Sequence, residues 1–217
     1  MRSKYHGRIQ EMAENLFELY EMETSDADVE NGARWYDKAH AIMREWSESY
    51  GYSIATCAAV TAAISPQCEW ERNLVIADDI LAGRPAVSIG GALHANLDKA
   101  RFLRDYRLSD PCAAFKSAPK VCAFARNLAG DLSAVTVDTH ATQAALADVT
   151  VTVGLNAAKY EAFAEAYAMA ADAVLLQRAT FQAIIWHTWK RLHPRVEKTL
   201  IRKAHNRARK AARQHAS

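Results

Sequence analysis

Apolar residues recur at intervals of three and four along nearly the whole chain, and few residues interrupt that pattern. Trp35, Ile42 and Trp46 illustrate the spacing, which places their side chains on one face of an α-helix. Only 8 glycines and 5 prolines occur in 217 residues, so residues that end helices or make turns are scarce. The β-branched run 149–153 is the one strand-like stretch, and we expect it to be an extended connector because it has no evident partner. The sequence therefore predicts an all-α fold.

Turn and capping residues divide this pattern into separate helices. Ser53–Ile64 is rich in alanine and almost wholly apolar, which predicts a helix buried at the centre of the fold. Asn127 and Asp131 flank Gly130 and are predicted to be turn and C-cap residues. The other predicted helices are centred on 16–20 and 35–46, and span about 67–81, 91–106, 111–115, 118–128, 141–147, 156–175 and 178–192.

Charge is distributed unevenly along the chain. Residues 195–217 contain eight Lys or Arg and one Glu, a charge of +7, so the rest carries −5 to give the net charge of +2. We expect one helical domain over residues 1–194, followed by a basic helix or tail over 195–217. The basic segment is either a solvated end or an arm that follows phosphate groups of nucleic acid, and in the second case Arg202, Lys203 and Arg207 are candidate DNA contacts.

Several functional classes have little support in the sequence. No apolar run approaches the length of a membrane span and the N-terminus lacks a signal-peptide core, so we expect a cytoplasmic protein without a membrane partner. No Walker loop, zinc-protease motif or serine-hydrolase motif is present, and we expect neither a metal nor a cofactor. The four cysteines match no metal knuckle or small disulfide scaffold, which predicts reduced and mostly buried thiols at Cys57, Cys68, Cys112 and Cys122.

The segment Val135-Thr-Val-Asp-Thr-His-Ala141 places one carboxylate where a helix is predicted to begin. Asp138 or Thr139 can cap that helix, because Asp and Thr accept hydrogen bonds from the free N–H groups of a first turn. A carboxylate at this position can also be a catalyst, and the two roles are compatible. The neighbouring motifs bear on whether Asp138 has a catalytic role in addition to capping.

These motifs resemble the helix-hairpin-helix DNA glycosylase superfamily, which includes endonuclease III. In that family a hairpin between two short helices leads through a loop to Val-Asp-Thr-His at the start of the next helix. Lys120 and Asp138 are 18 residues apart, the separation associated with the catalytic lysine and aspartate of the lyase-type members. Ile64-Ser-Pro-Gln67, followed by Asn73, resembles the family's Leu-Ser-x-Gln…Asn stretch. The resemblance covers about residues 53–146.

The resemblance implies a DNA-binding, glycosylase-like helical domain that acts on a base or modified nucleotide extruded from DNA. Asp138 would stabilise the positive charge that develops at the sugar C1′. Lys120 would be either the nucleophile or a surface lysine in the first turn of its helix. Gln67 would either fill the gap left by the extruded nucleotide or belong to the cap and first turn of the following helix, which carries Asn73. Trp70 would either stack on a base or belong to the core, and His140 would either bond within the site or hold its loop.

The chain also departs from the family pattern. Lys116-Ser-Ala-Pro-Lys120 replaces the usual Gly-x-Gly hairpin, although a helix that begins at Pro119 still presents free N–H groups to a phosphate, with Lys116 beside it. The segment 121–131 resembles phage-encoded relatives implicated in building hypermodified thymines, and such a protein would work in the host cytoplasm. Two alternatives stay open: a transferase that attaches an amino acid or amine, with Asp138 as the base, and a non-catalytic DNA-binding module.

Overall fold

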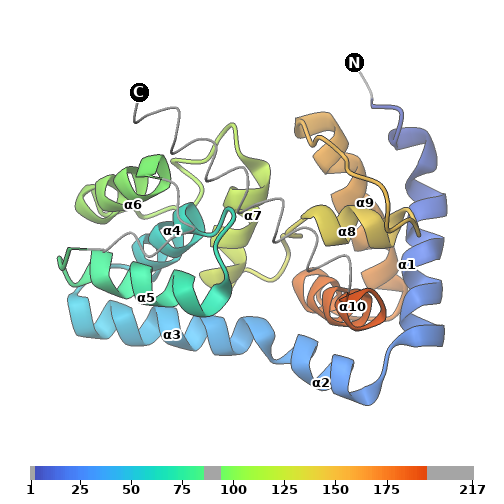
Figure 1. Cartoon of the computed structure of the whole chain (residues 1–217), viewed down its shortest axis with the longest axis horizontal. Coiled ribbons are helices and arrows are strands. Elements are labelled where there is room, and N and C mark those ends of the chain that lie inside the picture. Colours follow the sequence, from blue (N-terminus) through green and yellow to red (C-terminus); the bar gives the residue numbers. More distant parts are fainter. Residues whose placement is uncertain (1–2, 86–93, 195–217) are drawn as a thin grey trace.

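The computed structural model describes residues 3–85 and 94–194 (Figure 1). Every regular element in these two ranges is a helix, which confirms the all-α prediction. No helix in the same ranges combines the length and the apolar character needed to cross a membrane. The basic segment 195–217, with Arg202, Lys203 and Arg207, lies outside the described residues.

The elements follow one another in a simple order. A short 3-10 turn, η1 His6–Arg8, precedes the first α-helix. The segment predicted as a helix over 111–115 is instead a series of turns, in which an Asp110 carboxylate oxygen accepts from the Cys112 N–H at 2.9 Å. The α-helices are α1 Ile9–Glu23, α2 Asp26–Ala33, α3 Trp35–Tyr50, α4 Ile54–Ile64, α5 Trp70–Leu81, α6 His94–Tyr106, α7 Pro119–Leu128, α8 Thr139–Ala145, α9 Ala157–Ala173 and α10 Arg178–Leu192.

The helices form two lobes with separate hydrophobic cores (Figure 1). The first lobe consists of α3, α4, α5, α6 and α7, and the second consists of α1, α8, α9 and α10. The chain starts in the second lobe with α1, enters the first lobe through α2 and α3, and returns after α7. The segment 129–138 therefore crosses from one lobe to the other and ends at the start of α8.

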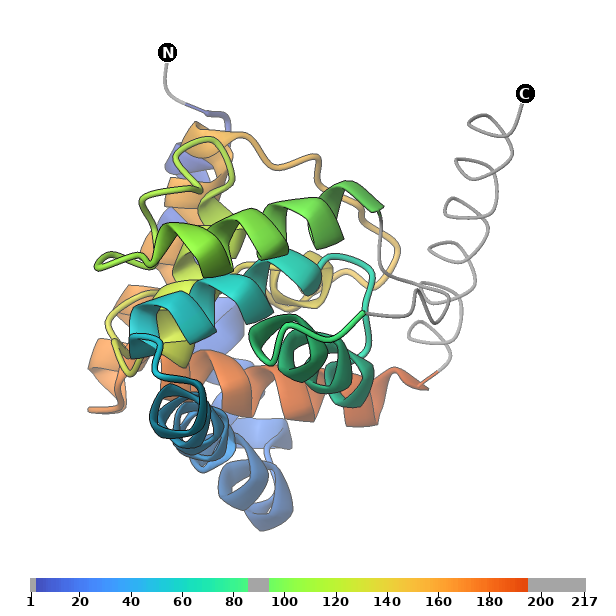
Figure 2. The same cartoon turned by 90° about the vertical axis from the view of Figure 1, so that its left-hand side faces the viewer.

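α4 lies at the centre of the first lobe, as predicted from its alanine-rich sequence. Residues 56–64 are all buried, and α4 packs between α6 and α3 (Figure 2). Ser53 caps the helix by accepting from the Thr56 N–H at 3.1 Å, and its hydroxyl donates to the carbonyl oxygen of Leu108 at 2.6 Å. Small alanine side chains allow the neighbouring helices to approach closely, so one short helix organises the whole lobe.

α2 packs tightly against α10 and so joins the two lobes. A Cβ atom added to Gly32 would lie 2.5 Å from the Cα of Ile184, so only glycine fits at this contact. One turn earlier, the Asp28 carboxylate completes a capping box with Ser25 and accepts from the Arg191 Nε at 2.9 Å. Burial alone would raise the pKa of Asp28, but the hydrogen bonds from Arg191 and Ser25 outweigh it and lower that pKa.

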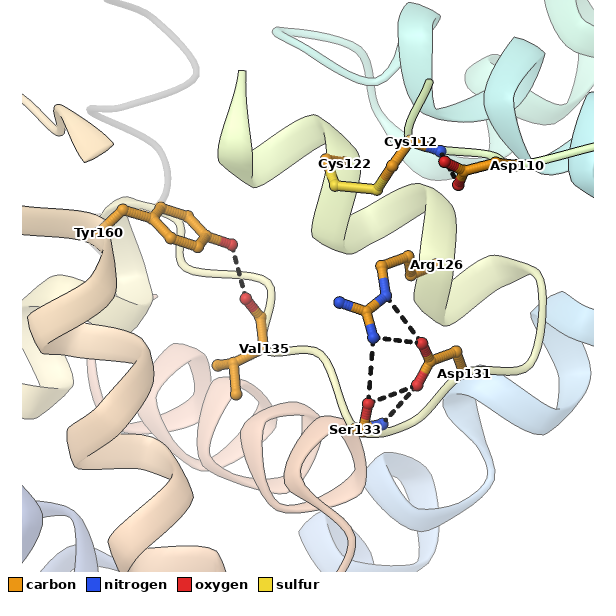
Figure 3. The surroundings of a disulfide bond; sticks show 8 residues. All are labelled: Asp110, Cys112, Cys122, Arg126, Asp131, Ser133, Val135 and Tyr160. Atoms are coloured by element: carbon orange, nitrogen blue, oxygen red, sulfur yellow. Dashed lines mark hydrogen bonds and ion pairs between the residues drawn. A yellow bond between two sulfur atoms is a disulfide. The ribbon is translucent and has the colours of Figure 1, made fainter. Parts of the chain in front are cut away.

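The prediction of four reduced thiols is wrong for two of the cysteines. Cys112 and Cys122 form a disulfide with a Cα–Cα distance of 4.7 Å (Figure 3). The turns after Asp110 bring Cys112 back against the first turn and a half of α7, a fold-back that a spacing of 10 residues does not reveal. Cys57 and Cys68 are free thiols, and burial raises the pKa of Cys57 to about 11.

Candidate functional site

Asp138 is the N-cap of α8, at the point where the chain re-enters the second lobe. Its backbone is extended, with φ −110° and ψ −168°, and its Oδ1 accepts from the Ala141 N–H at 2.8 Å. The predicted capping role is therefore confirmed. Among the described residues no donor reaches Oδ2, and the side chain is only half-buried. One oxygen of the carboxylate thus holds the helix, while the other has no hydrogen-bond partner among the described residues.

The segment that leads into Asp138 is buried and rigidly held. The Tyr160 hydroxyl, on α9, donates to the Val135 carbonyl oxygen at 2.6 Å (Figure 3). The same hydroxyl accepts from the Val137 N–H at 3.2 Å. Burial raises the pKa of Tyr160 above its ordinary value, with the charge of Asp138 a further contribution, so the hydroxyl keeps its proton. One side chain therefore satisfies two backbone groups just before the capping carboxylate.

A buried polar cluster ties this segment to the first lobe. With its amide turned so that both ends find partners, Asn127 accepts from the hydroxyls of Tyr36 at 3.2 Å and Thr136 at 3.0 Å. Its nitrogen then donates to the carbonyl oxygens of Asp131 and Ala134 at 2.9 and 3.1 Å. Burial raises the pKa of Tyr36 to about 12, and the nearby charge of Asp138 contributes.

Asn127 lies in the last turn of α7, where its carbonyl oxygen accepts from the Gly130 N–H at 3.1 Å. Its side chain, which the sequence placed in a turn, is instead fully buried and connects α3, α7 and the crossing segment. Asp131 does stabilise a turn, since it accepts from the Ser133 N–H at 3.0 Å and pairs with Arg126 (Figure 3). The hydrogen bond from Ser133, opposed by partial burial and helped by Arg126, lowers the pKa of Asp131. This arrangement fixes the path of the chain between α7 and α8.

Lys120 lies in the first turn of α7 and is exposed. Pro119 is the first residue of α7, as predicted, and no side chain caps the N–H groups of that turn. Helical periodicity puts Lys120 on the same face of α7 as Phe124 and Asn127, the face that turns toward α3 and the crossing segment. Lys116 is exposed in the turn just before the helix.

Gln67 lies in an exposed turn between α4 and α5. Its φ of +65° is left-handed, an uncommon conformation for a residue other than glycine. The helix predicted to begin after Pro66 begins only at Trp70, so the side chain of Gln67 projects from a turn rather than from a helix. Arg107, Ala147 and Leu175 share this left-handed conformation, so it marks Gln67 as a turn residue.

The two predicted site residues on α5 have different surroundings. Trp70 is half-buried and packs against Trp35, with ring centroids 5.0 Å apart, and against Phe124 at 6.3 Å. Asn73 is fully buried, and neither end of its amide has a hydrogen-bond partner among the described residues. Trp70 is therefore part of an aromatic cluster at the edge of the first lobe, whereas Asn73 belongs to the interior of that lobe.

His140 lies on the second-lobe side, in the first turn of α8. It is half-buried, and its ring is 6.4 Å from that of Trp186 on α10. The Lys190 ammonium in turn lies 4.0 Å from the Trp186 ring centroid. Burial lowers the pKa of His193, and the neighbouring His140 contributes. An aromatic and basic group of side chains thus adjoins the start of α8.

A cavity of about 620 Å³ lies between α7, the crossing segment and α9. Small residues that face one another across the helices, such as Ala123 and Ala164, leave this space. No pattern in the sequence predicts this cavity, because it exists only when α7 and α9 lie side by side. Its charged lining residues are Arg126, Glu161, Glu165, Asp172 and Arg178.

The described residues contain no cluster of three or more His, Cys, Asp or Glu side chains able to hold a metal ion. No curated protein and no solved structure matches the chain. One family does match, over residues 1–193, and its description is "Family of unknown function (DUF7178)". Because that match covers most of the chain, the protein belongs to the DUF7178 family.

Proposed function

We propose that this protein binds DNA and acts on a base or modified nucleotide that is extruded from the helix. The observation that carries the proposal is the position of Asp138. Its carboxylate lies where the chain crosses between the two lobes, it is only half-buried, and one of its oxygens is not used for capping. The sequence resemblance to the helix-hairpin-helix glycosylases assigns the catalytic role to this same residue.

The chemistry requires a carboxylate held in a fixed position. As a base departs, positive charge develops at the sugar C1′, and a pre-positioned negative charge stabilises that transition state. Asp138 is fixed by its capping bond to Ala141, and the segment before it is held by Tyr160. A carboxylate fixed in this way loses little orientational freedom when substrate binds.

Other residues of the chain have the chemistry that a nucleic acid requires. Trp70 and Phe124 on the first lobe, and Trp186 on the second, are half-buried aromatic side chains on which a base can stack. The exposed amine of Lys120 and the segment 195–217 supply positive charge for phosphate groups. Gln67, in its exposed turn, would occupy the space that an extruded nucleotide leaves.

Nucleoside mass spectrometry on treated DNA tests the proposal. The full chain is incubated with duplexes and single strands that carry damaged bases, hydroxymethyluracil or its phosphorylated form, the last with added amines. Release of a base supports excision, whereas incorporation of an amine supports transfer on the same fold. If every nucleoside is unaltered while DNA still binds, the protein is a non-catalytic binding module and the proposal is wrong.

Trapping with borohydride then tests the role of Lys120. A lysine that attacks C1′ forms an imine with the sugar, and reduction makes that link permanent. We expect a covalent adduct with the wild-type chain, none with Lys120→Ala, and an unchanged yield with Lys38→Ala, which removes another exposed lysine on α3. An adduct that persists in Lys120→Ala excludes this residue as the nucleophile.

A further inference from the structure

The disulfide between Cys112 and Cys122 tethers the turns before α7 to α7 itself (Figure 3). Both cysteines are half-buried rather than enclosed in the core. The tethered turns contain Lys116 and lead directly into the first turn of α7. A covalent link at this place therefore controls the backbone that precedes the helix.

Only one of the two cysteines borders the cavity between α7 and α9. Cys122 is among its lining residues and Cys112 is not. The cavity of about 620 Å³ is open to solvent and falls in the size range of small-molecule sites. A small thiol that enters this cavity therefore meets the disulfide from the side of Cys122.

The cavity presents charges of both signs. Arg126 uses Nε and Nη2 for Asp131 and Ser133, which leaves Nη1 directed away from that pair (Figure 3). On α9, Glu161 and Glu165 are one turn apart and exposed, and neither forms an ion pair with another described residue. Such a lining suits a zwitterion, with carboxylate near the arginine and ammonium near the glutamates.

We infer that Cys112–Cys122 is a site of reversible thiol–disulfide exchange with a small zwitterionic thiol of the glutathione type, which binds in the cavity between α7 and α9. The incoming thiolate attacks the Cys122 sulfur, forms a mixed disulfide there, and expels the Cys112 thiolate, which takes up a proton. A second thiol then attacks the mixed disulfide, releases Cys122 as a thiol and leaves as the oxidised disulfide. Two electrons pass from the two small thiols to the protein disulfide.

Reduction loosens the tethered turns without unfolding the lobe. Phe115 in these turns is almost fully buried, and the Lys99 ammonium donates to the Ala114 carbonyl oxygen at 2.9 Å. These contacts are independent of the disulfide and keep the turns against α6. Reduction of the disulfide thus increases the conformational freedom of the segment before α7 and leaves the rest of the fold in place.

Mass spectrometry of the full chain tests this inference. After purification without reductant and alkylation, we expect a linked Cys112–Cys122 peptide, with Cys57 and Cys68 recovered as alkylated thiols. Exposure to limiting glutathione, followed by acid quenching, should give the mixed disulfide on Cys122. Recovery of all four residues as alkylated thiols, or of the mixed disulfide mainly on Cys112, would overturn the inference.

Two single variants test whether binding in the cavity, rather than the solvent exposure of a thiol alone, determines which cysteine reacts. Cys112→Ser and Cys122→Ser each leave one thiol of the pair, and both are treated with glutathione disulfide. We expect the thiol in Cys112→Ser to react about ten-fold faster than the one in Cys122→Ser, because only Cys122 borders the cavity. Adding Glu165→Gln to Cys112→Ser should slow the reaction with glutathione disulfide but not with the uncharged disulfide of mercaptoethanol. Equal rates for the two single variants would contradict binding in the cavity, and so would a Glu165→Gln effect that is the same for both disulfide reagents. Circular dichroism verifies that each variant is folded.

Discussion

Replacing Tyr160 with phenylalanine tests how the crossing segment is held. The substitution removes the hydroxyl that bonds Val135 and Val137. Val137 is fully buried, so no water replaces the partner of its N–H, whereas Val135 also lines the cavity that opens to solvent. A buried polar group without a partner costs about 1–3 kcal/mol, so the unpaired Val137 N–H predicts a loss of about 1–3 kcal/mol. For a chain of this size the loss corresponds to a fall in Tm of roughly 2–12 °C.

The measurement is equilibrium unfolding in guanidinium, followed by circular dichroism at 222 nm. Tyr50→Phe is the matched control, because the Tyr50 hydroxyl donates to the partly exposed Asp78 carboxylate at 2.6 Å, where water can replace it. We expect that control to cost less than about 1 kcal/mol. If Tyr160→Phe is no more destabilised than Tyr50→Phe, the reasoning about the crossing segment is refuted.

Two further substitutions test the contact between α2 and α10. Gly32→Ala should lower stability by about 1–3 kcal/mol in thermal unfolding, because the added Cβ would overlap the backbone of Ile184. Gly154→Ala is the control and should have little effect, because a Cβ added there meets nothing within 4 Å. Asp28→Asn should cost about 1–2 kcal/mol at neutral pH through the loss of a charged hydrogen bond with Arg191. Because the pKa of Asp28 is lowered in the folded protein, its contribution to the free energy of unfolding is complete above about pH 4 and disappears as the pH falls through the folded pKa. The difference in that free energy between the wild type and Asp28→Asn should therefore narrow in acid. If that difference in the free energy of unfolding stays constant down to pH 2, the ion pair between Asp28 and Arg191 is not its cause.

Local patterns in the sequence predicted much of the fold. The alanine-rich stretch Ser53–Ile64 predicted a buried central helix, and α4 is that helix. Asp138 was predicted as a helix cap from its place before an apolar run, and it accepts the expected hydrogen bond. Both predictions depend on interactions within a few residues, which periodicity and capping preferences describe well.

The features that the sequence did not predict depend on contacts between distant segments. Asn127 has the sequence context of a turn residue, yet its partners Tyr36 and Thr136 lie on other elements. The Cys112–Cys122 disulfide depends on a series of turns that replaces a predicted helix. The cavity between α7 and α9 likewise requires two helices that are remote in the chain to lie side by side. No local pattern encodes such pairings.

The most direct test of a catalytic role for Asp138 is the single-turnover rate of product formation by Asp138→Asn. Asparagine caps helices about as well as aspartate, so the variant keeps the bond to Ala141 and removes only the charge. We expect Tm and DNA affinity to stay close to those of the wild type, while the rate falls on the order of 10²- to 10³-fold. Asp148→Asn, which alters another carboxylate that stabilises a turn, should keep the full rate. A folded Asp138→Asn protein that forms product at the wild-type rate would contradict the central claim.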